Sequence, residues 1–174
     1  AKRGSRIPVV MSEQETIRVL ENLEEPYRLI AEIMYGCGLR IMKGIELRIQ
    51  DIDFDNAMLI IRNAKGQKDR TAPLPQSLIP RIERQVAYAK RRYTKDMSNP
   101  EFDGVFMPEE MHGFPEYLPR QFGWYFLYPS QELTWVEEEC AYRRYHVHET
   151  TVQRKIREAV QKARVPRRIT SHTL

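Results

Sequence analysis

Apolar residues recur at helical spacing in three parts of the chain. The first part begins with the capping box Ser12-Glu-Gln-Glu15, in which the serine can accept from the third helical amide while Glu15 reaches back. It ends at Gly36 and Gly38. The second part starts at Leu78 and continues into the basic run 90–95, and the third covers 149–163. The apolar positions behind these predicted helices are Ile17, Leu20, Leu23, Tyr27, Ile30, Ile33, Met34, Leu78, Ile79, Ile82, Val86, Ala89, Val152, Ile156, Val160 and Ala163.

Between the first and second helical parts, the apolar period changes towards that of a strand. A short helical pattern after Arg40 gives way to a β pattern over residues 51–61. The basic turn 65–70 follows, and Ala72-Pro-Leu-Pro75 ends the returning strand because proline cannot donate to a β ladder. These signals predict a β-hairpin with Lys65 at its tip.

Residues 98–135 show neither period and are rich in proline and aromatic residues. Seven aromatic residues fall within the fifteen residues 114–128. A loop of this length inside a domain is usually functional or disordered, and so many aromatic side chains argue against disorder. They are Phe114, Tyr117, Phe122, Trp124, Tyr125, Phe126 and Tyr128.

The composition of the 174 residues, 41% apolar and 30% charged, fits one globular domain with a large hydrated surface. The net charge is only +4, but it is unevenly distributed. Residues 143–174 hold nine Lys or Arg against two Glu, and residues 98–139 hold nine Asp or Glu against one Arg. This distribution favours a polyanionic partner on one face, and two solvated faces are the plain alternative.

Two cysteines, Cys37 and Cys140, do not suggest a disulfide framework and fit a reducing compartment. The sequence shows no signal peptide and no long apolar run, so a cytoplasmic protein without a membrane partner is predicted.

Arg40 and Lys65 are the two side chains best suited to grip a phosphate. The guanidinium of Arg40, which follows Gly36-Cys-Gly38-Leu, offers a planar fork of donors to two phosphate oxygens. Lys65 is a compact ammonium at a hairpin tip, which can reach into a groove and give up a proton if its pKa is tuned.

Three blocks of the chain together resemble the catalytic domain of tyrosine recombinases, the phage integrase family. They are Tyr35-Gly-Cys-Gly-Leu-Arg-Ile41, Lys65-Gly-Gln-Lys-Asp-Arg70 and Thr170-Ser-His-Thr-Leu174, the last resembling the start of a His-x-x-Arg motif. They occur in the family's order, and the resemblance covers residues 8–174. It implies an α+β, mostly helical fold with a small antiparallel β-sheet or hairpin. It also implies site-specific DNA recombination and integration without a cofactor, by a homotetramer on DNA.

In the resembled family a tyrosine attacks the phosphodiester to form a phosphotyrosine intermediate, and positioned cations stabilise the transition state. Carried over by motif position, Arg40 is the first clamp arginine, Lys65 the hairpin lysine that protonates the leaving oxygen, and His172 the motif's histidine. Lys68 and Arg70, in the same turn as Lys65, are predicted to contact nucleic acid.

Two departures from the family pattern bear on activity. The sequence ends two residues after His172, before the family's second clamp arginine and its tyrosine nucleophile, so this chain is predicted not to cleave DNA. The family usually has an acidic residue three positions after the first arginine, where this chain has Lys43, and whether Glu46 takes its place stays open. Residues 1–8 are expected to be a basic linker from a core-binding domain, and residues 9–174 a partial catalytic domain.

Within the family, residues 98–148 resemble the extra segment of integron integrases. The similarity lies in Phe122-Gly-Trp-Tyr-Phe-Leu-Tyr-Pro-Ser130 and Arg143-Arg-Tyr-His-Val-His148. That segment grips bases flipped out of a folded single-stranded recombination site, and a base stacked on an aromatic ring gains about 1–3 kcal/mol. The resemblance implies nucleic-acid contacts by Trp124, Arg143, Arg144, Tyr145 and His146. The alternative for Trp124 is packing into a core.

Other functions stay open at this point. The chain could be a DNA-binding module or inactive remnant without chemistry, or a basic domain with protein partners. A metal site made of His112, Cys140, His146 and His148 is disfavoured because their spacing matches no standard zinc pattern, so no metal is predicted.

Overall fold

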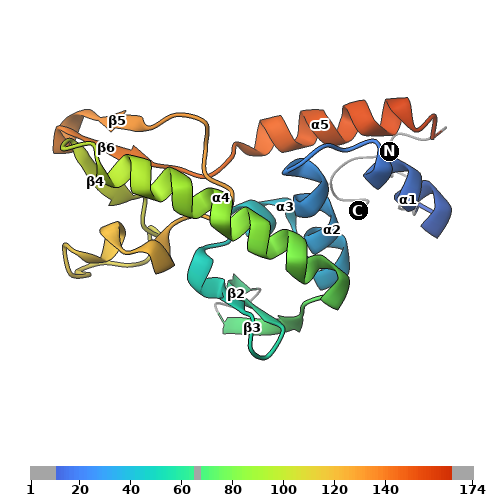
Figure 1. Ribbon diagram of the computed structural model, residues 1–174, viewed down its shortest axis with the longest axis horizontal. Helices are drawn as coiled ribbons and strands as arrows, with labels where there is room; N and C mark the ends of the chain where they lie inside the picture. Colours follow the sequence, from blue (N-terminus) through green and yellow to red (C-terminus); the bar gives the residue numbers. More distant parts are fainter. Residues whose placement is uncertain (1–10, 65–67, 166–174) are drawn as a thin grey trace, which may run out of the picture.

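Helix α4 (Ile79–Met97) runs across the structure and joins two groups of elements (Figure 1). The computed structural model describes residues 11–64 and 68–165. The helices are α1 (Glu13–Glu21), α2 (Tyr27–Cys37), α3 (Ile41–Ile45), α4 and α5 (Glu149–Lys162). The strands are β1 (Ile52–Asp53), β2 (Met58–Ala64), β3 (Lys68–Pro73), β4 (Phe102–Val105), β5 (Thr134–Val136) and β6 (Ala141–Arg144). Short 3-10 turns cover Ile49–Asp51, Gln76–Leu78, Leu118–Arg120, Phe122–Trp124 and Glu137–Glu139.

The three predicted helical parts are confirmed, and the first of them consists of two helices, α1 and α2. Helix α1 begins at the predicted capping box: the amide of Glu15 donates to Ser12 Oγ at 3.2 Å, and the amide of Ser12 donates to Glu15 Oε2 at 2.9 Å. These bonds satisfy two amides that a helix start would otherwise leave unpaired. Helix α2 ends at Cys37 with the predicted Gly38 as its C-cap, whereas Gly36, also predicted to end it, lies within the helix.

The predicted hairpin is the β2–β3 pair of an antiparallel sheet with the order β1-β2-β3. Leu59 lies opposite Ala72 and Ile61 opposite Arg70, and the register shifts between Ile61 and Ala64. Because the side chains of a strand alternate between its two faces, this register turns Leu59, Ile61 and Ala72 towards the core.

The segment after α4, predicted to be irregular, contains a second sheet. Its strand order is β4-β6-β5, with β4 parallel to β6 and β5 antiparallel to β6. Strands β4 and β6 lie near the two ends of the segment, so the intervening residues leave this sheet and return to it. Strands of three or four residues carry too few alternating positions for a sequence pattern to reveal them.

Two apolar cores lie along α4. The larger one is formed by α1, α2, α3, β2, α4 and α5, with Ile30, Ile45 and Leu59 fully buried. The smaller one packs Phe102, Tyr125 and Phe126 around the α4 end that faces the second sheet. Of the segment's aromatic residues, Phe122, Trp124, Tyr125 and Phe126 therefore belong to this ordered core, whereas Tyr128 belongs to the larger core and Tyr117 is exposed. Burial stabilises the fold by about 25 cal/mol per Å² of apolar surface removed from water.

None of the helices in the described ranges is long and apolar enough to cross a membrane. The longest, α4, carries six basic residues.

Candidate nucleic-acid interface

Arg40 lies just before α3, with an exposed side chain between two buried neighbours. Leu39 and Ile41 are 7% and 2% exposed, so they anchor the backbone on both sides of Arg40. Gly38 makes the turn possible because its φ of +61° is a left-handed conformation that costs other residues energy. The sequence Gly-Leu-Arg-Ile thus presents one guanidinium to solvent from a fixed loop.

Arg70 of β3 attaches the hairpin to the loop that carries Arg40. Its Nη2 donates to the carbonyl oxygens of Gly38 at 3.1 Å and Cys37 at 3.4 Å. These carbonyls lie at the C-terminal end of α2, where backbone acceptors have no partner within the helix. The sequence predicts that Arg70 contacts nucleic acid, and the structure gives this nitrogen a positioning role beside Arg40.

The other two residues predicted to be catalytic, Lys65 and His172, lie outside the described residues. Their roles stay predictions. Lys68 is exposed at the start of β3, opposite Ala64, and its contact with nucleic acid also stays a prediction.

Lys43 forms an ion pair with Glu46, its Nζ lying 3.6 Å from Oε2. Glu46 is the candidate to replace the acidic residue usual in the family. Its carboxylate is instead next to Lys43, and within the described ranges Arg40 forms no ion pair.

A cavity of about 490 Å³ lies beside α3, between that helix, strand β2 and the segment after α4. Tyr145 and His146 line it together, with ring centroids 3.9 Å apart and planes tilted by 32°. Phe106 meets the Tyr145 ring edge-on at 5.4 Å. The arrangement supplies what a flat ligand needs, an aromatic surface with polar groups around it.

His146 is a buried wall of this cavity. His146 is only 3% exposed, and its Nδ1 lies 2.7 Å from the carbonyl oxygen of Val147. Burial lowers the pKa of His146 below 6.5, because an ion loses hydration there. The ring is therefore neutral at pH 7. Tyr145, which is half-buried, is the more open of the two.

Arg48 fastens the segment after α4 to the rest of the domain. Nη1 donates to the carbonyl oxygen of Trp124 at 2.7 Å, and Nη2 donates to that of Phe106 at 2.8 Å. Its guanidinium carbon lies 4.2 Å from the centroid of Phe126. Burial lowers the pKa of Arg48 to about 10, so it remains charged at pH 7.

Asp51 completes this network. One of its oxygens accepts from the backbone amide of Arg48 at 2.9 Å, and the other accepts from Nε of Arg62 at 2.6 Å. Sequence reasoning missed all three residues. A weak signal was present, since Arg48 and Asp51 lie three residues apart, a spacing that brings side chains together in a helical turn.

Trp124 is half-buried, and its predicted contact with nucleic acid stays a prediction. It packs against the smaller core, and the guanidinium groups of Arg48 and Arg62 lie 5.4 and 5.9 Å from its ring centroid. It does not line the 490 Å³ cavity.

The predicted contact of Arg144 with nucleic acid is not retained. Arg144 is 3% exposed, and it donates from Nε and Nη2 to the two carboxylate oxygens of Asp96 at 2.9 and 2.6 Å. A guanidinium committed to a buried carboxylate does not reach a phosphate. Neighbouring Arg143 is also occupied, since it pairs with Glu139 and with Asp103.

The sequence and the fold both have counterparts among known proteins. The model of the phage integrase family matches residues 9–174. The chain belongs to the phage integrase family. An integrase/recombinase of Escherichia coli is 34% identical over 169 residues, which cover 97% of this chain and 50% of that protein. The tyrosine recombinase XerA of Pyrococcus horikoshii is 27% identical over 182 residues, covering 91% of this chain and 62% of the relative.

Solved structures show the same fold. The crystal structure of XerA recombinase matches with a TM-score of 0.60 and 23% identity, over 99% of this chain and 49% of that one. XerH site-specific recombinase bound to palindromic difH substrate matches with a TM-score of 0.59 and 16% identity, over 99% and 42%. The predicted α+β recombinase fold is confirmed. This phage integrase family member spans about half the length of the curated relatives it matches.

Proposed function

We propose that this chain supplies the phosphate-binding part of a DNA-recombining tyrosine recombinase, in which Arg40 holds the scissile phosphate. The observation that carries the proposal is the bond between Arg70 and Gly38, because it holds the strand returning from the Lys65 hairpin against the Arg40 loop. In the proposed reaction Arg40 stabilises charge on the phosphate oxygens, Lys65 protonates the leaving oxygen, and His172 adds a further donor. A tyrosine nucleophile completes the reaction in the family.

The test compares binding and covalent capture on one nicked DNA duplex. Arg40→Ala is expected to weaken binding and Arg40→Lys to weaken it less, because lysine keeps the charge and loses the planar fork. Arg18→Ala, at an exposed position of α1, is the matched control. Covalent protein–DNA product on the same duplex reports whether a tyrosine of this chain attacks the phosphate. Binding that is equal in all variants would contradict the proposed role of Arg40.

We also propose that the DNA is a folded single strand, as the resemblance to integron integrases implies, and that an unpaired base enters the 490 Å³ cavity. Tyr145 offers the stacking surface, with His146 beside it. Trp124 packs against the smaller core and in this way supports the segment. Arg48 keeps this wall in place through the carbonyls of Trp124 and Phe106.

The base proposal is tested with two hairpins that differ by one extrahelical base. Tyr145→Ala is expected to remove the preference for the hairpin with the extra base, a loss of about 1–3 kcal/mol of stacking, whereas Tyr145→Phe should keep it. Tyr117→Ala, at a position 61% exposed, is the control. If Tyr145→Ala keeps the preference, the base lies elsewhere.

The second candidate function is DNA binding without chemistry. It is favoured by Lys43, which places a positive charge where most of the family has an acidic residue. An extended protein carrying the family's second arginine and tyrosine distinguishes the two: covalent capture of nicked DNA supports the recombinase, and tight binding without capture supports the binding module.

A further inference from the structure

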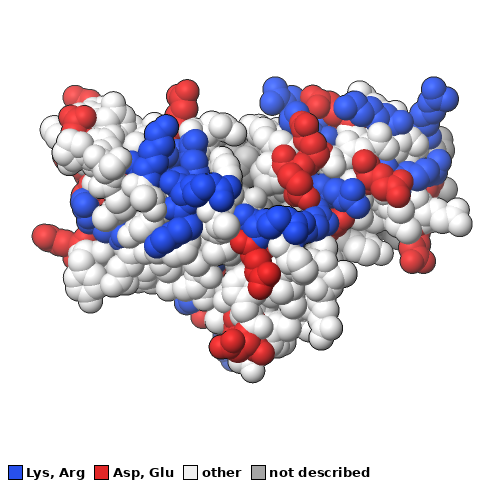
Figure 2. All heavy atoms as spheres, viewed as in Figure 1, with Lys and Arg blue, Asp and Glu red and all other residues white. Residues whose placement is uncertain are grey.

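Helix α4 carries more positive charge than any other described helix. It holds six basic residues and two acidic ones. Of the acidic residues, Asp96 is buried against Arg144, which leaves Glu83 at the surface. Figure 2 shows blue atoms gathered along the band that α4 occupies in Figure 1.

Three of these cations form a stripe together with a tyrosine. Arg84, Tyr88, Arg91 and Lys95 follow one another at spacings of four, three and four residues, which places them on one face of a helix. The stripe is about 16 Å long at the helical rise per residue. Within the described ranges no acidic side chain pairs with any of its three cations, in contrast to Arg81, which contacts Glu25 and Glu32. Arg91 lies over the Tyr88 ring at 6.0 Å.

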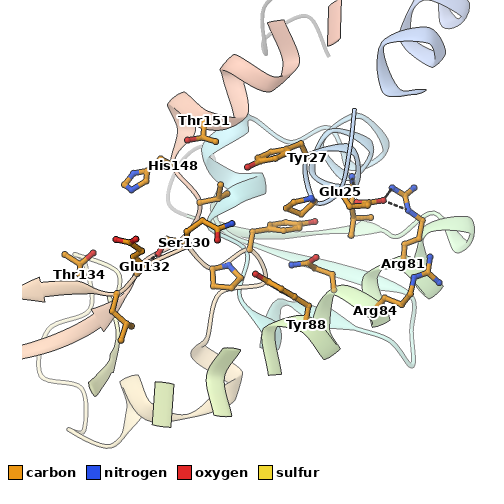
Figure 3. Close-up of a pocket in the computed structure, with 18 residues that line it drawn as sticks. Glu25, Tyr27, Arg81, Arg84, Tyr88, Ser130, Glu132, Thr134, His148 and Thr151 are labelled. Atoms are coloured by element: carbon orange, nitrogen blue, oxygen red, sulfur yellow. Dashed lines mark hydrogen bonds and ion pairs between the residues drawn. The ribbon is translucent and has the colours of Figure 1, made fainter. Parts of the chain in front are cut away.

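A cavity of about 770 Å³ opens beside the stripe, and Arg84 and Tyr88 form part of its wall. Figure 3 shows Tyr27 and Tyr88 on different sides of it, and Arg84 lies on α4 one turn before Tyr88. Tyr128 also lines the cavity; it is 1% exposed, and its hydroxyl has no hydrogen-bond partner among the described residues.

This cavity is separate from the one proposed above for a base. The two share no lining residue, and α4 contributes nothing to the wall of the 490 Å³ cavity. The α4 face therefore needs its own explanation.

We propose that the α4 face binds a single strand of DNA, with its phosphates on Arg84, Arg91 and Lys95 and one base against Tyr88 in the 770 Å³ cavity. Proteins that hold single strands combine a basic track with aromatic rings, and this face has both. The inference rests on the proposed function for the identity of the polyanion, and it does not involve Arg40. A free nucleotide has the same chemistry as one unit of the strand, so the test separates the two.

The first experiment measures fluorescence anisotropy of a labelled oligothymidine against the whole chain at several salt concentrations. The triple variant R84Q/R91Q/K95Q is expected to bind about tenfold more weakly. The plot of log affinity against log salt concentration should also become shallower for this variant, by about 2. Each phosphate that is no longer neutralised on a single strand lowers the slope by about 0.7, and the variant loses three such contacts. The matched control R18Q/R157Q/K162Q removes three exposed cations from α1 and α5. Equal losses of affinity in both variants would mean that only net charge matters, and the proposal would fall.

The second experiment tests the base. Tyr88→Ala is expected to weaken oligothymidine binding several-fold and Tyr88→Phe to leave it unchanged, because the phenyl ring still stacks. If thymidine monophosphate binds as tightly as the oligonucleotide, the ligand of this face is a free nucleotide and the proposed single strand is wrong. A change in self-association without a change in oligonucleotide binding would assign the cavity to a second copy of the chain. Arg40→Ala should leave this binding intact, so failure here is distinct from failure of the proposed function.

Discussion

Arg144 and Asp96 form a bidentate ion pair in which each side chain is only 4% exposed. The hydroxyl of Tyr125 donates to the same carboxylate at 2.6 Å, and Nη1 of Arg144 donates to the carbonyl oxygen of Ser130 at 3.0 Å. The pair therefore connects α4 with β6 and with residues 125–130, across the middle of the segment that resembles the integron insertion.

Removing one partner of this pair should destabilise the fold strongly. Asp96→Ala leaves a buried guanidinium without its carboxylate, and we expect it to lower the free energy of unfolding by about 3–5 kcal/mol. Replacing both residues by apolar side chains of similar volume should cost much less, since no charge is then left unpaired. Urea denaturation measures both. The exposed pair between Arg154 and Glu158 is the control, and Arg154→Ala should cost less than about 1 kcal/mol.

Arg48→Met should loosen the segment after α4. The change removes the donors to the carbonyls of Trp124 and Phe106, and unpaired buried groups of this kind cost about 1–3 kcal/mol each. Hydrogen exchange should quicken at residues 106–126 more than in α2. Arg28→Met, which breaks a half-exposed pair with Glu32, is the comparison and should leave exchange in that segment unchanged. Equal protection in the two variants would mean that apolar packing alone holds the segment.

Gly38→Ala should disturb the Arg40 loop through backbone strain alone. A Cβ at this position meets no atom within 4 Å, so the cost arises from the φ of +61° and amounts to about 1–2 kcal/mol. Gly38→Asn should cost less, because asparagine tolerates this conformation better. Thermal unfolding gives the stabilities, and DNA affinity measured alongside shows whether Arg40 moves. A loss of stability as large for asparagine as for alanine would point to a steric clash instead of strain.

The free energy of unfolding should fall in mild acid because of His146. In the unfolded chain the ring takes up a proton near its ordinary pKa of 6.5, whereas burial lowers the pKa in the folded protein. The unfolded state therefore binds more protons as pH falls below 6.5, and stability decreases by at most about 1.4 kcal/mol per pH unit. Above 6.5 this group adds no pH dependence. His146→Gln should flatten the profile of unfolding free energy between pH 7.5 and 5, and the same change at exposed His112 should not.

Much of the domain was predictable because its signals are local. The capping box at Ser12, the glycine that ends α2 and the prolines after β3 each act within a few residues, and the structure has all three boundaries. The family motif placed Arg40 before α3, but only the three-dimensional structure shows that Arg70 holds its loop. That bond joins residues 32 apart, and no local pattern encodes it.

The basic residues of the insertion-like segment were harder to interpret from sequence. Arg143 and Arg144 are adjacent in a basic stretch, and adjacent residues on a strand point to opposite faces, so at least one was bound to face inward. The acidic residue that receives Arg144 lies 48 residues away, at the end of α4. The sequence shows that Arg144 is positively charged, but it does not show which residue is its partner.

The bond from Arg70 to Gly38 has a mechanical consequence. If Lys65 acts as proposed, the strand that leaves its hairpin and the loop that presents Arg40 are held together by the Arg70 side chain. A displacement of the hairpin would therefore be transmitted to the Arg40 loop. A DNA strand that moved Lys65 would also move Arg40.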